Sequence, residues 1–503
     1  MKRPSLLTLL MTIAFSFLLL ILTISGLAYT QAPAVNDAIF IVPNREPVDA
    51  GGGSFAPPAD ELSAADRQAI QSEINRNIDR LTADGALAVD ETTAVTLSWP
   101  ISAANGLKDY GYHGISNFVD HDARYGYLLD YSCGDRTYDI SGYNHQGTDF
   151  FTWPFAWNKM DNDEVVVVAA APGTIVGKRD GNYDRSCAMN NGDWNAVYIR
   201  HNDGSIAWYG HMKNGSLTSK NIGDTVVTGE VLGVVGSSGS STGPHLHLEL
   251  YSNSSYTTLI DPYNGTCNPT SSWWQTQRPY YDSAVNKVMT GNAPVESYSC
   301  PTPSVTNEQT EFIGGDTVYF TTFYRDQLSS QVSQYTIYQP DHSIYQRWTH
   351  SSPADHYAAS WWYWSFSLPT DAMSGDWRFE VVFNGQTYET TFNVSKYINI
   401  TAPAGAAIWQ PGTVMTITWQ DNFTDDVQID LLKGGLLSTT ITTTVSNGRY
   451  DWTIPISSTT GLDYQIRIAD VADTAVTSTS DPFAIGQREQ FNNLYLPLTM
   501  KEK

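Results

Sequence analysis

Residues 242–249 constrain the fold of this chain more than any other part of the sequence. They read Thr-Gly-Pro-His-Leu-His-Leu-Glu, so histidine and leucine alternate. Because successive side chains of a β-strand point to opposite faces, His245 and His247 share one face while Leu246 and Leu248 share the other. The leucine face suits a protein core. Two neighbouring imidazoles suit neither a core nor an ordinary surface, so the sequence predicts a strand that presents a metal ligand, or a ligand together with a catalytic base.

A second segment, residues 145–149 (HQGTD), supplies further metal-binding side chains. In a fully extended chain the Cα atoms of His145 and Asp149 would lie about 13 Å apart, so the backbone must fold back for both to reach one ion. Gly147 permits such a bend. With His247, these residues form a set of two imidazoles and one carboxylate. That set is typical of a catalytic Zn²⁺ site whose fourth position stays open to water.

Two further histidines are candidates for acid–base work beside this predicted zinc site. His211 ends a strand-like run, and its same-face neighbour Tyr209 is a candidate hydrogen-bond donor. His245 lies beside a ligand on the same strand face. Histidine titrates near neutral pH, so either residue can act as the base, and the sequence does not choose between them. The competing interpretation, scattered surface or core histidines, is disfavoured because these residues fall in three glycine-flanked segments.

Together the segments resemble the lysostaphin/LytM-type zinc endopeptidases, whose pattern is H-x-G-x-D, then Y-x-H, then G-x-S-T-G-P-H-L-H-x-E. Here the pattern falls on residues 145–149, 209–211 and 239–249. The resemblance implies a β-sheet groove and cleavage of peptide bonds in bacterial peptidoglycan. It also implies two sets of residues, metal ligands and catalytic histidines: His145, Asp149 and His247, then His211 and His245. Residues 97–143 and 178–193 are longer than the corresponding stretches of the family pattern, and we expect them to reshape the groove.

The two ends of the chain and its cysteines bear on location. Residues 1–30 read as a signal peptide, with Lys2 and Arg3 before a long apolar run, although an uncleaved anchor is the alternative. Either interpretation places the rest of the chain outside the membrane, secreted or at the cell surface. The chain has four cysteines, which predict two disulfides in an exported protein, with the pairing left open. The tail, residues 487–503, has no firm interpretation.

The sequence between these ends predicts a mainly β protein with one short N-terminal helix. Residues 31–94 read as a linker and a helix capped by Ser63, with apolar residues at helical spacing. The antiparallel β-sheet peptidase domain is expected over residues 95–290. Two β-sandwich domains of immunoglobulin-like type are expected over residues 300–395 and 397–486. The second of these resembles the Ser/Thr-rich immunoglobulin-like domain of cell-wall-associated proteins.

The formal net charge of -24 disfavours a nucleic-acid partner, which would need a basic surface. The expected partners are peptidoglycan or another peptide substrate, and cell-surface polysaccharide bound through the C-terminal domains. Oligomeric state is left open. Two alternatives to an enzyme are a non-catalytic regulator of other wall hydrolases and an adhesin. For the adhesin, Trp361, Trp362 and Trp364 are candidates for stacking on sugars, although core positions suit them better.

Overall fold

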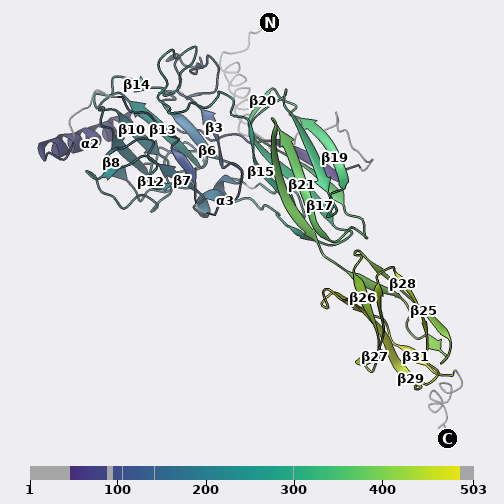
Figure 1. Ribbon diagram of the computed structural model, residues 1–503. Coiled ribbons are helices and arrows are strands. Elements are labelled where there is room, and N and C mark those ends of the chain that lie inside the picture. The colour runs from purple at the N-terminus through teal and green to yellow at the C-terminus, as the bar shows by residue number, and fades with distance from the viewer. Residues whose placement is uncertain (1–45, 88–93, 105, 141, 298, 488–503) are drawn as a thin grey trace, which may run out of the picture.

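The computed structural model describes residues 46–87, 94–104, 106–140, 142–297 and 299–487. Three β-rich domains follow one another along the molecule, with helix α2 (Ala64–Ala83) on the outer side of the first (Figure 1). No helix within these ranges is long and apolar enough to cross a membrane. The predicted signal peptide and the C-terminal tail beyond residue 487 lie outside the described residues.

The first domain is built on an antiparallel sheet of eight strands that carries the candidate site. Its main path runs β11-β8-β9-β10-β13-β6-β3, and β14 pairs with β13. These strands are β11 (Thr225–Val226), β8 (Gly173–Arg179), β9 (Ala196–Arg200), β10 (Ile206–Gly210), β13 (His245–Tyr251), β6 (Thr148–Thr152), β3 (His113–Asn117) and β14 (Leu259–Ile260). A second sheet has the order β12 (Val231–Val234), β7 (Val165–Val168), β2 (Ile101–Ala103). The short strands β4 (Asp139–Ile140) and β5 (Tyr143–Asn144) form a separate pair.

Helix α2 covers the outer face of this sheet, as the apolar spacing predicts. Ser63 is its N-cap and accepts a hydrogen bond from the backbone N–H of Asp66 at 3.1 Å. Ile70, Ile74 and Leu81 are buried, and they pack in one cluster with aromatic residues of β9 and β10. A second helix in the described part of the chain is the short α3 (Ala156–Asp161), which was not expected.

The second domain is a β-sandwich with an aromatic core. One sheet has the order β1 (Asp49–Ser54), β20 (His356–Ser367), β17 (Thr317–Leu328), β15 (Ala284–Gly291). The other has the order β16 (Glu311–Phe312), β22 (Gln386–Val394), β21 (Gly375–Phe383), β18 (Val332–Tyr338), β19 (Ile344–Ser351). Trp362 and Trp364 are buried between the sheets, so they are core residues and not sugar-stacking platforms.

Two features of this sandwich differ from the sequence expectation. Strand β15 pairs with β17, so the sandwich begins before residue 290, inside the range expected for the peptidase domain. Residues 49–54, expected to be part of a linker, form β1 and pair along their whole length with β20. Gly52 makes this possible, because a Cβ there would lie 2.2 Å from the backbone oxygen of Trp361.

The third domain is a smaller sandwich joined to the end of β22. One sheet has the order β23 (Ile398–Ala402), β25 (Val414–Asp421), β28 (Arg449–Thr453). The other has the order β24 (Ile408–Trp409), β31 (Phe483–Ile485), β29 (Gly461–Asp470), β26 (Asp426–Lys433), β27 (Leu436–Val445), and β30 (Thr477–Thr479) pairs with β29. Both predicted disulfides are present. Cys133 pairs with Cys267 inside the first domain, and Cys187 of the first domain pairs with Cys300, which lies between β15 and β16 of the second.

Candidate active site

Strand β13 divides its side chains between a core and a polar centre. Leu246, Leu248 and Leu250 pack in the main core of the first domain. His245 and His247 point the other way, and both are buried. The strand lies between β10 and β6, so residues of these two strands flank the polar face. The alternation predicted from the sequence is the alternation observed.

Strand β6 places the carboxylate of Asp149 beside this face. Asp149 stands directly opposite His247 in the antiparallel register of β6 and β13. His145 precedes β6, and its ring centroid lies 5.2 Å from that of His247. Gly147 is needed between them, since a Cβ there would lie 2.5 Å from Nε2 of the His247 ring. The small residue therefore permits the close approach as well as the fold-back of the chain.

The surroundings of His145 leave one ring nitrogen without a hydrogen bond. Its Nδ1 lies 2.7 Å from the carbonyl oxygen of Phe118, which can only accept, so Nδ1 carries the proton. Its Nε2 is buried, 3.1 Å from Oδ2 of Asp149, yet forms no hydrogen bond. In the neutral imidazole, this lone pair faces a carboxylate that is also an acceptor. A cation between the two satisfies both groups, which is the usual role of a histidine oriented by a backbone carbonyl.

His247 is oriented in the same way by a carboxylate. Its Nε2–H donates to Oε2 of Glu249 at 3.2 Å, and Glu249 is itself paired with Arg67 of helix α2. Its Nδ1 then faces the centre, 3.0 Å from Oδ1 of Asp149 and 2.9 Å from Oδ2 of Asp60. The hydroxyl of Tyr251 also donates to Glu249. Helix α2 and β13 thus support the orientation of this imidazole.

The two histidines predicted to be catalytic lie together at one side of the centre. The ring centroids of His211 and His245 are 4.5 Å apart. Nδ1 of His211 donates to the carbonyl oxygen of Ser238 at 2.6 Å, and Nδ1 of His245 donates to that of Gly243 at 2.8 Å. The Nε2 of His245 is buried without a hydrogen bond. Each ring therefore presents its Nε2 for proton transfer or for a ligand.

Tyr209 is not beside these histidines, contrary to the expectation from strand alternation. His211 follows β10 with a backbone φ of 62°, so the alternation of faces is broken at this residue. Tyr209 lies in the main core, where its hydroxyl accepts a hydrogen bond from the backbone N–H of Ala170 at 2.9 Å. It cannot donate to a group in the centre.

Asp60 is the residue of this centre that sequence reasoning missed. It is fully buried, and its carboxylate lies 2.7 Å from Nε2 of His211 and accepts from the hydroxyl of Tyr138. Ligand atoms of Asp60, His145, Asp149 and His247 all lie within 4.8 Å of one another. The only local signal is an acidic residue between buried apolar neighbours, which is too common to identify a ligand.

The charges in this centre shift one another's ionisation. Burial raises the pKa of Asp60, but the nearby His247 and His211 outweigh it and hold this pKa well below its ordinary value. Burial lowers the pKa of His247, but Asp60 and Asp149 outweigh it and raise this pKa well above the ordinary value. For His245, burial and then the neighbouring His211 lower the pKa to about 4. The centre thus contains carboxylates that stay ionised and an imidazole that stays neutral at neutral pH.

The donor set fits a Zn²⁺ ion. Nitrogen and carboxylate donors are the ligands that zinc prefers, and each imidazole has its other nitrogen anchored, which fixes the tautomer. His247 comes from β13, Asp149 from β6 and His145 from the segment just before β6, so the sheet itself assembles three donors. Asp60 belongs to a segment laid over the sheet. The sheet alone therefore provides a three-donor site with two histidines beside it.

Comparisons with known proteins agree with this geometry. Residues 143–260 match Peptidase family M23, and residues 402–485 match the Kre9/KNH-like N-terminal Ig-like domain. The glycyl-glycine endopeptidase ALE-1 of Staphylococcus capitis is 35% identical over 138 residues, which are 27% of this chain and 33% of that protein. Lysostaphin of Staphylococcus simulans is 31% identical over 175 residues, 32% of this chain and 31% of that protein.

A third relative is similar over a shorter stretch. The DD-carboxypeptidase/endopeptidase Mpg of Neisseria meningitidis serogroup B is 43% identical over 84 residues, 16% of each chain. The chain thus spans a third or less of the length of these curated relatives. The match to Peptidase family M23 covers the residues of the histidine and aspartate centre from His145 to His247.

Proposed function

We propose that this chain, which carries a peptidase family M23 domain followed by an immunoglobulin-like domain, is a zinc metalloendopeptidase that hydrolyses peptide bonds of peptidoglycan stem peptides or cross-bridges. The observation that carries the proposal is the convergence of His145, Asp149 and His247, with ligand atoms within 4.8 Å of one another. The names of the relatives, among them a glycyl-glycine endopeptidase, support the substrate class.

The roles of the residues follow from their surroundings. His145, Asp149 and His247 would hold the metal. Bound zinc supplies Lewis acidity that activates water and polarises a peptide carbonyl. His245 is buried, has a pKa lowered to about 4, and keeps Nε2 free, so this neutral nitrogen can accept or share a proton. His211 beside it directs its own Nε2 into the centre, and when both ring nitrogens carry protons it can donate to a developing oxyanion.

Export to an oxidising compartment is part of the proposal. The two disulfides, Cys133–Cys267 and Cys187–Cys300, support it because disulfides persist outside the reducing cytosol. Such a location also brings the enzyme to cell-wall peptides. Binding of cell-surface polysaccharide by the C-terminal domains stays a prediction.

Digestion of defined muropeptides, followed by mass spectrometry with and without a chelator, tests the proposal and names the bond. We expect cleavage that stops on chelation and returns when Zn²⁺ is added. Asp149→Ala and His247→Ala should each lose both the metal and the cleavage. His121→Ala is a matched control, because His121 lies in the same domain but pairs with Asp261 and is not among the residues whose ligand atoms converge. A protein that binds no zinc and releases no fragment would overturn the proposal.

A further inference from the structure

We propose that a cavity between the first and second domains binds one neutral sugar ring of the glycan strand that carries the peptide substrate. This cavity, called the interdomain cavity below, is lined by residues of both domains, among them Trp153, Phe155, Phe323 and Trp361. Its volume of about 230 Å³ is below the roughly 300–1,000 Å³ of pockets for drug-sized ligands, which suits a single ring. The inference rests on the proposed function and names the part of the substrate that is bound beside the reacting peptide.

The interdomain cavity lies next to the candidate centre along the chain. Residues 242–244 line it and lead into β13, whose first residue is His245. The carbonyl oxygen of Gly243 accepts the hydrogen bond from Nδ1 of His245 at 2.8 Å, so the same turn borders the cavity and orients a predicted catalytic histidine. In peptidoglycan each stem peptide is covalently attached to a sugar. A sugar site beside the centre therefore matches the connectivity of the substrate.

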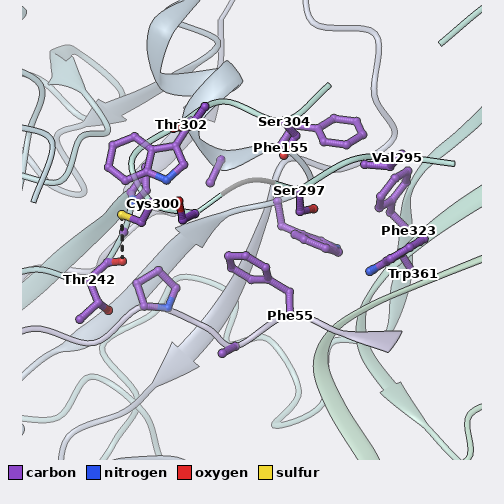
Figure 2. A pocket seen from close by; sticks show the side chains of 18 residues that line it. Phe55, Phe155, Thr242, Val295, Ser297, Cys300, Thr302, Ser304, Phe323 and Trp361 are labelled. Atoms are coloured by element: carbon purple, nitrogen blue, oxygen red, sulfur yellow. Dashed lines mark hydrogen bonds between the residues drawn. The ribbon is translucent and has the colours of Figure 1, made fainter. Parts of the chain in front are cut away.

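Aromatic rings form much of the lining of the cavity, and none of the described residues that line it is charged. Phe55 stacks on Trp153 with ring centroids 5.2 Å apart. Figure 2 shows Phe55 at the cavity, with Thr242 on one side and Phe323 and Trp361 on the other. A charged ligand would lose hydration here without gaining a charged partner. The lining therefore favours a neutral ligand that has an apolar face.

Hydroxyl side chains form a further part of the lining. Ser297, Thr302 and Ser304, from the segment between β15 and β16, all border the cavity. Ser304 is held by its backbone, whose N–H and carbonyl oxygen each hydrogen-bond to the side chain of Asn158 at 3.0 Å. A serine or threonine hydroxyl can donate and accept, as the hydroxyls of a sugar do. Aromatic faces together with neutral hydroxyls favour a sugar over a purely apolar ligand, which would leave these hydroxyls unpaired.

Trp361 is the ring best placed to stack on a sugar. It lies on the face of β20 opposite to the core residues Trp362 and Trp364, and it is half-buried where it lines the cavity. Its ring is nearly parallel to that of Tyr363, at 14° with centroids 5.7 Å apart, which holds the indole in one orientation. The apolar face of a sugar ring can pack on such a flat, partly exposed surface. Of the three tryptophans considered for sugar stacking, Trp361 is thus the one whose position suits it.

The walls of the cavity are held by bonds between the two domains. The indole N–H of Trp153 donates to the carbonyl oxygen of Tyr324 at 2.9 Å, and the side-chain amide of Asn286 donates to the carbonyl oxygen of Trp153 at 3.0 Å. Cys300, which lines the cavity, is tied to Cys187 by a disulfide. A preorganised cavity loses little freedom on binding, so a ligand as small as one sugar ring can be held there.

The test uses the full chain and three variants. Trp361→Ala removes the stacking surface, and Trp361→Phe keeps an aromatic ring at the same place. Tyr319→Ala is the matched control, because Tyr319 is a half-buried ring on the neighbouring strand β17 that contacts Tyr363 but does not line the cavity. Calorimetry should show the same unfolding transitions for all three variants as for wild type, which establishes that each is folded.

The first measurement is sugar binding without cleavage. The trisaccharide of β-1,4-linked N-acetylglucosamine is neutral and carries no peptide, and its Kd for each protein is measured by ligand-observed NMR titration. We expect Trp361→Ala to raise this Kd about ten-fold and Trp361→Phe about two-fold, in line with the loss of one stacking contact or of part of it. Tyr319→Ala should match wild type.

The second measurement compares two substrates that share one peptide. One is a muropeptide that keeps its disaccharide, and the other is the same peptide after removal of the sugars. We expect wild type to have the lower KM for the sugar-linked form. This preference, expressed as the ratio of the two KM values, should fall about ten-fold in Trp361→Ala, because the lost contact binds substrate and transition state alike.

The outcomes separate the sugar site from the reaction. If the trisaccharide fails to bind wild type, or binds wild type and Trp361→Ala equally, the inference is overturned. It is also overturned if the sugar-free peptide shows the dependence on Trp361 expected of the trisaccharide, since the cavity would then bind peptide. If trisaccharide binding depends on Trp361 but no form cleaves either substrate, the sugar site is supported and the proposed reaction is wrong. If both substrates are cleaved and neither measurement depends on Trp361, the reaction stands and the sugar site is refuted.

Discussion

Replacing Arg67 by methionine should selectively destabilise the first domain. Arg67 of α2 pairs with Glu249 of β13, whose side chain is 0% exposed, while that of Arg67 is 11% exposed. The guanidinium also donates to the hydroxyl of Tyr251 at 2.9 Å. In Arg67→Met the carboxylate of Glu249 stays buried without its cation. Methionine retains much of the apolar stem, so the change tests the charge more than the packing.

The size of the effect follows from the surviving contacts of Glu249. Removing one partner of a buried ion pair costs about 3–5 kcal/mol. Glu249 keeps hydrogen bonds from Tyr251 and from Nε2 of His247, so we expect the lower end, about 3 kcal/mol. For a domain of this size that corresponds to a fall in Tm of roughly 6–12 °C. Differential scanning calorimetry of the full chain should show one transition moving and the transitions of the two sandwiches unchanged.

Two variants make this prediction refutable. Arg76→Met is the matched control, because Arg76 lies on the same helix but is exposed, and it should move the transition by less than about 2 °C. The double variant Arg67→Met/Glu249→Gln should be more stable than Arg67→Met alone, because no charge is then left buried. If Arg67→Met behaves like Arg76→Met, the pair contributes no buried charge interaction and the reasoning is wrong.

Two further changes address the second domain and its connection to the first. Burial lowers the pKa of His350 to about 4, so the unfolded chain binds more protons than the folded chain between that pH and about 6.5. The free energy of unfolding of the second domain should therefore fall by up to about 3 kcal/mol as the pH falls through this window. Denaturant unfolding of His350→Gln should show a flatter pH dependence, and an unchanged slope would contradict the prediction. Replacing Cys187 and Cys300 by serine opens a loop of 113 residues and should cost about 4–5 kcal/mol by loss of chain constraint. An unfolding midpoint insensitive to the replacement would contradict this prediction.

Sequence patterns predicted those strands, helices and turns that are defined by residues close together in the sequence. The alternation of histidine and leucine predicted the two faces of β13, and Ser63 with the isoleucines that follow it predicted helix α2. Asn384 and Gly385 form an Asn-Gly pair typical of a hairpin turn, and they join β21 to β22 with φ values of 49° and 75°. In each case the residues that define the element are near neighbours in sequence, so the pattern carries the whole signal.

Features that depend on distant pairing left little trace in the sequence. Strand β1 is a Gly-rich run that resembles a linker, and only the close approach of β20 explains its glycines. Asp60 has no metal-ligand spacing around it, because its partners lie from Tyr138 to His247 along the chain. Tyr209 failed as a candidate for a related reason: the backbone of His211 leaves the extended region, which strand alternation cannot anticipate.

The three sheet donors and Asp60 are held in different ways. Nδ1 of His145 is anchored by a backbone carbonyl, and Nε2 of His247 by Glu249, while Asp149 is fixed by its register opposite His247. These constraints belong to the sheet, so they persist whatever covers it. Asp60 lies outside the sheet, on a segment that pairs with the turn before β13, and its backbone N–H donates to the hydroxyl of Tyr138. Because the sheet fixes His145, Asp149 and His247, their donor atoms are already in place for a metal ion.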